Sequence, residues 1–219
     1  MADIRFVQAD TLKEKPADVS KVGFGRVFTD YMFEMDYNPE EGWHDARIVP
    51  YQDVPLSPAN ATLHYGQAIF EGCKAYRYEG GKAVVFRAKD HIARLNRSAK
   101  ILDIPEVDEK LVYDALMKLI DLEKDWIPDG PGQSLYIRPF IFSTDPYLGV
   151  SVGQYYKMMI ILSPVGAYYA NGFAPVKIMV EDTYVRAPKG GLGAAKTPAN
   201  YAASLHGGLI AHEKGYDQT

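Results

Sequence analysis

Ser134-Leu-Tyr-Ile-Arg-Pro-Phe-Ile-Phe142 determines the fold class that this sequence predicts. Apolar and aromatic side chains dominate the segment, as is typical of a strand in a sheet. Pro139 has no N–H to donate to a neighbouring strand, so the sequence predicts a sheet edge or a bulge at this position. A second apolar run, residues 156–162, predicts another strand after it.

Two amphipathic helices are predicted before this strand. Between Asp90 and Leu102, apolar residues recur at three- and four-residue spacing while basic residues occupy another face. A second helix is expected to begin near Asp108 and to end before Pro128. The side chains predicted to face inward on the second helix are Leu111, Ala115, Leu116, Leu119 and Leu122.

Further upstream, strand patterns return. Residues 31–37 alternate apolar and acidic side chains, which predicts a half-buried strand. Residues 69–78 and 83–86 read as two strands around Glu79-Gly80-Gly81-Lys82, and a Gly-Gly pair between strands favours a tight hairpin. Runs of strands around a helix pair indicate an α+β fold rather than a doubly wound sheet.

Downstream of residue 162 the pattern changes. Residues 163–172 are rich in turn formers and predict a connection between domains. One strand at 176–180 and one helix from about Pro198 to His212 follow, with Gly215 as a C-cap. One strand and one helix cannot close a core, so we expect a small domain at 1–165, an interdomain loop at 166–174 and the incomplete beginning of a larger domain at 175–219.

Composition excludes several classes of protein. The chain has 219 residues, 47% hydrophobic and 24% charged, with a net charge of −4, which argues against disorder and against non-specific nucleic-acid binding. Cys73 is the single cysteine, and the N-terminus lacks the apolar core of a signal peptide. No apolar run approaches the roughly 20 residues of a membrane helix. We therefore expect a cytoplasmic protein that binds small molecules.

The glycine-rich segment 186–201 carries the strongest chemical signal. Gly190, Gly191 and Gly193 precede Lys196 and allow a close backbone approach. The phosphate-binding P-loop pattern fails because Ala195 replaces the glycine before the lysine, and the dinucleotide pattern fails at its last glycine. A lysine among small residues is either a solvated surface residue or a poorly solvated amine that forms a Schiff base with a carbonyl such as that of pyridoxal phosphate.

Four segments, 63–72, 86–99, 134–139 and 190–205, together resemble the branched-chain amino acid aminotransferases. These are class IV, fold-type IV enzymes that depend on pyridoxal 5′-phosphate. The resemblance extends from about Gly23 to the last residue, with the motifs in the family's order. It implies a complete small N-terminal domain followed by the start of the larger cofactor-binding domain.

The resemblance implies a role for each matching residue. Lys196 would carry pyridoxal phosphate as a Schiff base and move a proton from the substrate Cα to the cofactor. Tyr201 would bond the cofactor's phenolic oxygen, and Arg94 would bind its phosphate. On the strand, Tyr136 would serve the α-carboxylate and Arg138 the distal carboxylate of glutamate or 2-oxoglutarate, since alternate strand residues share a face.

Further residues match the substrate pocket of the family. Packing in the core or in a loop is the alternative interpretation of each one. By similarity, Val150 would be lent to the pocket by the partner subunit of a homodimer. The pocket residues implied in this way are Tyr65, Phe70, Val150 and Tyr168. His64 and His206 have no neighbours at metal-ligand spacing and are interpreted as structural, so no metal site is expected.

Three functional hypotheses follow. The first is an aminotransferase that moves the amino group of L-leucine, L-isoleucine or L-valine to 2-oxoglutarate. The second keeps the fold but changes the chemistry, to a D-amino-acid aminotransferase or an aminodeoxychorismate lyase. The third is an inactive fragment, because the family takes the glutamate for the pyridine nitrogen and most phosphate ligands from positions beyond residue 219.

Overall fold

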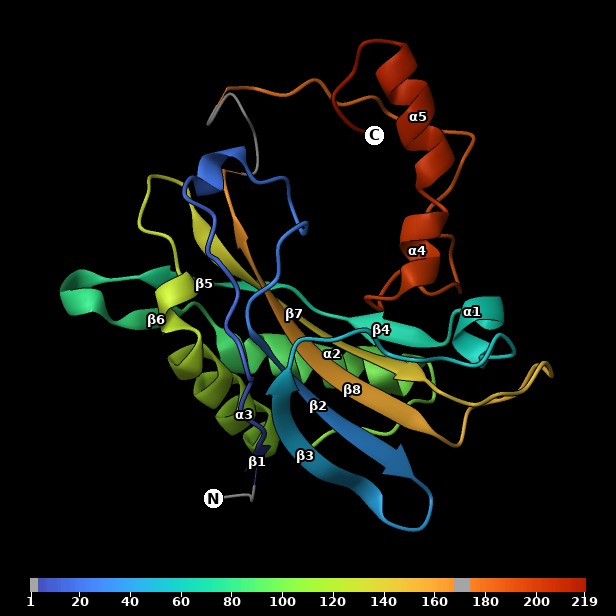
Figure 1. Ribbon diagram of the computed structural model, residues 1–219. Coiled ribbons are helices and arrows are strands. Elements are labelled where there is room, and N and C mark those ends of the chain that lie inside the picture. Colours follow the sequence, from blue (N-terminus) through green and yellow to red (C-terminus); the bar gives the residue numbers. More distant parts are fainter. Residues whose placement is uncertain (1–3, 168–173) are drawn as a thin grey trace.

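The computed structural model describes residues 4–167 and 174–219. In these residues one mixed sheet of eight strands forms the body of the molecule (Figure 1). The strand order is β1-β3-β2-β8-β7-β5-β6, and β4 pairs with β7 next to β5. The strands are β1 (Arg5–Phe6), β2 (Tyr31–Asn38), β3 (Gly42–Pro50), β4 (Ala68–Phe70), β5 (Cys73–Arg77), β6 (Ala83–Val85), β7 (Ser134–Ser143) and β8 (Tyr156–Val165).

Helices cover one face of this sheet and extend from one end of it. The long helices α2 (Ala88–Ile101) and α3 (Glu109–Leu122) pack on the sheet. Of the two C-terminal helices, the first adjoins β4 and the second stands away from the sheet (Figure 1). The remaining elements are α1 (Ala61–Tyr65), α4 (Pro198–Ala202), α5 (Leu205–Glu213) and the 3₁₀ turns η1 (Val19–Lys21), η2 (Glu79–Gly81) and η3 (Lys124–Trp126).

The two predicted strands at 134–142 and 156–162 are present as β7 and β8, which pair antiparallel along their whole length. The prediction of an edge or a bulge at Pro139 was wrong, because β7 lies inside the sheet. The Pro139 carbonyl accepts the Glu71 N–H at 2.7 Å, at the point where the neighbouring chain is interrupted between β4 and β5. The N–H and C=O of a strand residue point to the same side, so the missing donor of the proline faces this interruption.

The continuous strand predicted at 69–78 is divided into β4 and β5. Gly72 lies at the division, and a Cβ there would be 2.1 Å from Tyr136 Oη on β7. A regular side chain therefore does not fit at this position. The hairpin between β5 and β6 is confirmed, with Gly80 and Gly81 at φ of 72° and 76°.

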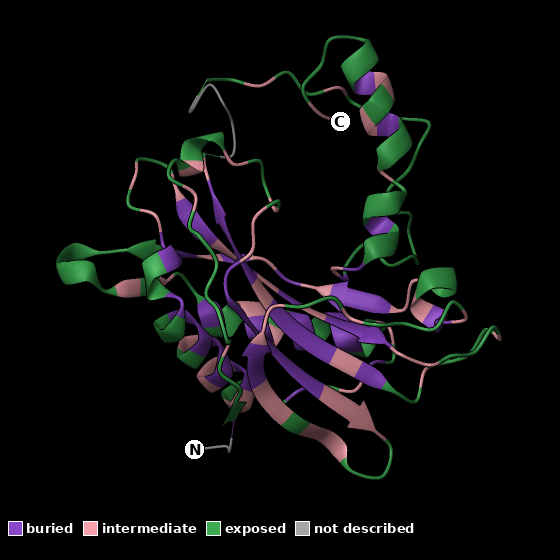
Figure 2. Ribbon diagram, in the orientation of Figure 1, coloured by how far each residue is buried: buried purple, intermediate pink, exposed green. Residues whose placement is uncertain are grey.

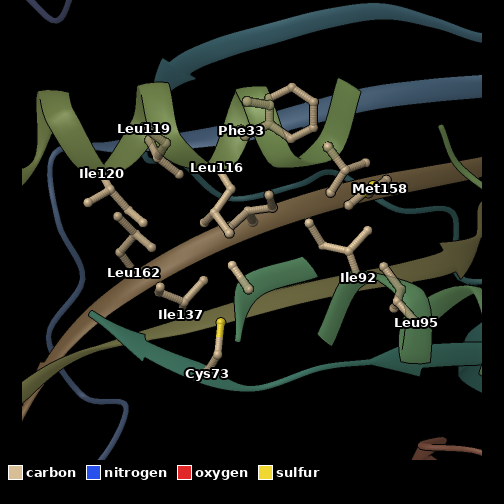
Figure 3. Packing of buried hydrophobic residues seen from close by; sticks show 14 of the residues in the cluster. Phe33, Cys73, Ile92, Leu95, Leu116, Leu119, Ile120, Ile137, Met158 and Leu162 are labelled. Atoms are coloured by element: carbon tan, nitrogen blue, oxygen red, sulfur yellow. The ribbon is translucent and has the colours of Figure 1, made fainter. Parts of the chain in front are cut away.

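Both predicted helices are confirmed, and they bury their apolar faces on the sheet. Asp108 caps α3 by accepting the N–H groups of Lys110 and Leu111. Figure 3 shows the core between the two helices and the strands, with Ile92, Leu95, Leu116 and Leu119 from the helices against Phe33, Ile137 and Met158. Leu122 was predicted to face inward, but it is exposed at the last turn of α3.

The opposite face of the sheet is partly buried as well (Figure 2). Its apolar cluster contains Met32, Val49, Ala68, Phe142 and Met159. Glu34 alternates with the apolar side chains of β2, yet its carboxylate is buried as well, with Arg47 at 2.6 Å and Lys157 at 3.6 Å. A buried carboxylate requires such partners because its desolvation opposes folding.

Two predictions for the C-terminal segment were wrong. Residues 176–180 form no strand: Ile178 makes an isolated bridge to Gln218, and Val180 is 91% exposed. The helix predicted at 198–212 is divided into α4 and α5 at Ala203 and Ser204. Gly215, at φ 79°, follows the last turn of α5 as expected of a C-terminal glycine. Most of α5 is exposed (Figure 2), and the described residues provide no second strand that would extend residues 176–180 into a sheet.

Within residues 4–167 and 174–219, no helix has both the length and the apolar character needed to cross a membrane. The same residues contain no group of three or more His, Cys, Asp or Glu side chains placed to hold a metal ion. Burial raises the pKa of the Cys73 thiol to about 12, so this cysteine stays neutral and packs as an apolar residue.

Glu123 follows α3 and is buried beneath the N-terminal segment, with 1% of its surface exposed. Its Oε1 accepts the Tyr31 N–H at 2.5 Å. The neighbouring Asp30 accepts the Trp126 indole N–H at 2.7 Å and the Lys13 N–H at 2.6 Å. Burial raises the pKa of Glu123 to about 7, although hydrogen bonds from Tyr31 and Thr29 act in the opposite direction.

The raised pKa of Glu123 predicts that the free energy of unfolding falls as the pH rises. The folded protein keeps the proton up to about pH 7, whereas the unfolded chain releases it near 4.5, so the stabilisation present below pH 4.5 is lost as pH passes 7. Replacing Glu123 by glutamine is expected to remove this loss, roughly 2 to 3 kcal/mol of unfolding free energy between pH 5 and pH 8. Urea denaturation of both proteins at each pH measures the difference.

Asp121→Asn, in the last turn of α3 before Glu123, is the matched control, because the Asp121 side chain is 82% exposed. It should keep the wild-type pH profile. Parallel pH profiles for the wild type and Glu123→Gln would contradict the prediction.

Candidate active site

The backbone around Lys196 is fixed where the glycine-rich segment crosses β4. The Lys196 N–H donates to Ser98 Oγ on α2 at 2.9 Å, and its carbonyl accepts the Phe70 N–H at 3.0 Å. The next residue, Thr197, donates through Oγ1 to the Ala68 carbonyl at 2.8 Å. The Lys196 backbone is therefore held between β4 of the sheet and α2, which packs on the sheet.

The glycine-rich segment is shaped by contacts within itself. Gly190 has φ of 78°, and a Cβ on Gly193 would be 2.8 Å from the Ala187 Cβ. Asn200 on α4 is buried and donates to the carbonyls of Leu192 and Ala195 at 2.8 and 2.7 Å. The glycines thus permit the tight path that brings Lys196 to β4.

The Lys196 amine lies against two aromatic rings. Its Nζ donates to Tyr201 Oη at 2.7 Å, and it is 4.5 Å from the centroid of the Phe70 ring. The Phe70 and Tyr201 rings are 4.9 Å apart at an angle of 52°. Tyr201 is 42% exposed, so the amine is bounded by aromatic surface and remains accessible to a ligand.

Arg138 and Tyr136 extend this group of side chains along β7. The Arg138 guanidinium is 4.6 Å from the Phe70 ring centroid, and Nη2 donates to Tyr136 Oη at 3.1 Å. Arg138 Nε is buried and has no hydrogen-bond partner among the described residues. Phe24 packs its ring edge-on against Tyr136 at 4.8 Å. A buried donor without a protein partner is available to a polar ligand group or to water.

Arg94 reaches the same region from α2. Its Nε and Nη2 donate to the two carboxylate oxygens of Glu71 at 2.5 and 2.7 Å. The arginine side chain is 45% exposed, and Nη1 makes no hydrogen bond within the described part of the chain. Glu71, which binds Arg94, directly follows Phe70, which contacts the Lys196 amine. These two consecutive residues therefore link Arg94 to Lys196.

The balance of charge around these residues is positive. Neither Lys196 nor Arg138 has a carboxylate within 4.0 Å among the residues that the structure describes, and Glu71 is engaged by Arg94. Two cations that lack a protein counter-ion favour an anionic ligand. An adjoining pocket of about 300 Å³ combines an apolar wall with one positive group, Arg138. Its apolar wall consists of Ala68, Ile69, Phe70, Phe140, Ile161 and Pro198.

The structure thus gathers Lys196, Tyr201, Phe70, Arg138 and Tyr136 through direct contacts, with Arg94 beside them. Two other predicted residues lie elsewhere. Tyr65, on α1, donates through its hydroxyl to the Leu148 carbonyl, and Val150 on the same loop is 84% exposed. Tyr168, together with residues 169–173 of the predicted interdomain loop, lies outside the described residues.

Comparison with known proteins identifies the family. The family model of the class IV aminotransferases matches residues 68–219, which include the whole group around Lys196. The chain belongs to the class IV aminotransferases. The predicted fold-type IV architecture is confirmed by this match and by solved structures of the same fold.

The relatives of this class IV aminotransferase are similar over nearly its whole length. Branched-chain-amino-acid transaminase 1 of Bacillus subtilis is 55% identical over 207 residues, which are 94% of this chain and 58% of the relative. The crystal structure of Escherichia coli branched-chain amino acid aminotransferase superposes with a TM-score of 0.69 at 32% identity, covering 86% of this chain and 58% of that one. That of Thermoproteus uzoniensis with norvaline gives 0.68 at 25% identity, covering 85% and 58%. The chain spans about three fifths of the length of these relatives.

Sequence reasoning missed several residues of this aminotransferase site. Glu71 stands inside a recognised motif, but a lone glutamate between two strands gives no sign of burial. Its partners His91 and Arg94 are three residues apart on α2, a spacing that places both on one helix face and was available as a signal. Phe24 and Asn200 have no periodic or chemical pattern that would separate them from ordinary loop and helix residues.

Proposed function

We propose that this class IV aminotransferase transaminates branched-chain amino acids with pyridoxal 5′-phosphate as its cofactor. The observation that carries the proposal is the Lys196 amine, which is held against Phe70 and Tyr201 beside Arg138, and neither cation has a protein counter-ion among the described residues. The branched-chain assignment is supported by the names of the relatives, including Branched-chain-amino-acid aminotransferase 2 of Bacillus subtilis at 52% identity.

The residues present fit pyridoxal phosphate. When bound, this cofactor supplies an aldehyde that condenses with amines and a ring that takes up electrons from the substrate's α-carbon. Lys196 is the amine that would hold the aldehyde, and the Tyr201 hydroxyl would serve the oxygen next to it. Arg94 has Nη1 available for the phosphate, a group that guanidinium binds well.

Lys196 is also the group placed to move the proton of the substrate Cα. An amine with no carboxylate partner could act as a base toward this proton. Tyr201 Oη, 2.7 Å from Nζ, keeps the amine oriented toward the Phe70 side of the site. The role of Tyr201 toward the lysine is therefore positional, through one hydrogen bond.

Substrate binding follows from the pocket beside Phe70. Its apolar wall suits a branched side chain, and Arg138 suits the distal carboxylate of glutamate or 2-oxoglutarate. Tyr136, hydrogen-bonded to Arg138, is assigned to the α-carboxylate. One pocket with an apolar wall and one cation thus accepts both substrates of a transamination in turn.

The wider organisation is part of the same proposal. We assign residues 1–165 to a small domain, 166–174 to the interdomain loop and 175–219 to the beginning of a larger cofactor-binding domain. The exposure of α5 supports the last assignment, because its apolar residues Leu205 and Leu209 are 71% and 56% exposed. We further propose a cytoplasmic homodimer in which the exposed Val150 reaches the partner's pocket, with Tyr65 and Tyr168 as pocket aromatics.

The direct test uses the protein expressed over the full length of its own coding region. Formation of glutamate from 2-oxoglutarate is measured with L-leucine, L-isoleucine and L-valine, and activity is compared with D-alanine and with aminodeoxychorismate. The L-amino acids are expected to be the good substrates. Preference for D-alanine or for aminodeoxychorismate would replace the proposal with the second chemistry of the same fold, and no turnover of any of them would reject it.

A further inference from the structure

Glu71 is a fully buried carboxylate in the candidate site, with no exposed side-chain surface. It lies in the interruption between β4 and β5, where its N–H donates to the Pro139 carbonyl at 2.7 Å. A carboxylate in this position opposes folding unless its oxygens are fully engaged. Its partners therefore indicate what the buried charge is used for.

Three residues converge on the two oxygens of Glu71. Arg94 donates to both, His91 Nδ1 is 3.1 Å from Oε2, and the Gly72 N–H donates to Oε2 at 3.1 Å. Burial raises the pKa of Glu71, but the hydrogen bonds from Arg94 and His91 outweigh it, and the pKa lies below its ordinary value. The group is accordingly an ionised acceptor.

The ion pair between Arg94 and Glu71 fixes the orientation of the guanidinium group. The guanidinium uses its Nε and Nη2 donors on the carboxylate, which leaves Nη1 on the remaining edge of the same plane. The side chain is 45% exposed although its partner is completely buried. A long arginine side chain that would otherwise sample many rotamers is thus held in one orientation.

The same segment also bears on the lysine. Phe70, the residue before Glu71, contacts the Lys196 amine through its ring and the Lys196 carbonyl through its N–H. Movement of the Glu71 backbone would therefore shift the aromatic surface under the lysine, whereas a change confined to the Glu71 carboxylate acts on Arg94. His91 and Arg94 hold this segment from α2, three residues apart.

We propose that Glu71 is a positioning residue for phosphate recognition, which holds Arg94 by one edge so that the other edge meets the phosphate of the cofactor. This inference rests on the proposed function, because it requires pyridoxal phosphate at Lys196. The alternative is that Glu71 only anchors the interruption between β4 and β5. If Glu71 positions Arg94, its replacement weakens the binding only of a ligand that carries the phosphate. If Glu71 only anchors the chain, its replacement weakens the binding of ligands with and without the phosphate alike.

The test compares pyridoxal 5′-phosphate with pyridoxal, which lacks the phosphate. Dissociation constants of both for the full-length protein are measured by absorbance titration, for the wild type, Glu71→Gln, Arg94→Lys and the double variant. For Glu71→Gln we expect about tenfold weaker binding of pyridoxal phosphate, with pyridoxal binding unchanged within twofold. The double variant is expected to bind no more weakly than Arg94→Lys, because the two residues act as a unit.

Glu79→Gln, in the exposed hairpin turn, is the matched control and should bind both compounds like the wild type. Circular dichroism reports whether Glu71→Gln folds, and Glu71→Asp, which keeps the charge but withdraws it by one methylene, provides the same comparison if it does not. Equal losses for both compounds, or additive losses in the double variant, would overturn the positioning role and leave the proposed function intact. A wild type that binds neither compound would instead refute the cofactor assignment itself.

Discussion

Replacing Lys196 by alanine is expected to abolish covalent attachment of pyridoxal phosphate and to reduce transamination by roughly 10²- to 10⁴-fold. The variant loses the amine that would hold the aldehyde and the base that would take the Cα proton. The Lys196 backbone contacts with Ser98 and Phe70, and the Thr197 hydroxyl contact with Ala68, do not involve the lysine side chain, so the fold should persist. Borohydride reduction followed by peptide mass mapping locates the attachment site, and steady-state turnover of L-leucine measures the activity.

Lys189→Ala is the control for this variant, because Lys189 is an exposed lysine of the same glycine-rich segment. It should retain both the adduct at Lys196 and the turnover. An adduct on another lysine in the wild type, or turnover within tenfold of wild type in Lys196→Ala, would show that the assigned residue is not the attachment site.

Replacing Gly72 by alanine is expected to disrupt the Tyr136–Arg138 pair and to destabilise the protein by about 1 to 3 kcal/mol. The new Cβ would be 2.1 Å from Tyr136 Oη and 2.9 Å from Cζ, and the tyrosine is confined by Phe24 and by its hydrogen bond to Arg138. The ring must move, which displaces the group assigned to the substrate carboxylate. Urea denaturation measures the stability, and the KM for L-leucine is expected to rise more than kcat falls.

Gly208→Ala provides the comparison, since apart from its chain neighbours and the backbone of α5 itself, no described heavy atom lies within 4 Å of the Cβ it would add. It should be neutral or stabilising by up to about 1 kcal/mol, because alanine favours a helix over glycine. Wild-type stability and KM in Gly72→Ala would contradict the prediction. They would show that Tyr136 can move away from the new Cβ without effect on folding or substrate binding.

The elements that sequence reasoning predicted correctly are those with local causes. The period of α2 and α3, the Asp108 cap and the Gly80-Gly81 turn each depend on residues within a few positions of one another. The elements it missed depend on distant partners. β3 contains Asp45 and Arg47 and has no apolar alternation, yet it is held by β2 and by the ion pairs of Arg47 with Glu34 and Asp36.

The same distinction applies to the candidate site. Lys196 and Tyr201 are five residues apart and stand in one motif, so the sequence places them together. Arg94 was one of several basic residues on a helix face, and nothing local separates it from the solvated ones. The ion pair with Glu71 is what separates Arg94 from the solvated basic residues. This pair could be identified only from the structure, in which β4 and α2 are adjacent.

The hydrogen bond between the Phe70 N–H and the Lys196 carbonyl has a consequence for measurement. The amide proton of Phe70 exchanges with solvent only when that contact opens, so its exchange rate reports how often the lysine backbone leaves β4. A single amide therefore acts as an internal probe of the site, readable without substrate or turnover. Ligands that tighten the site should slow this one exchange rate more than those of the neighbouring strand amides.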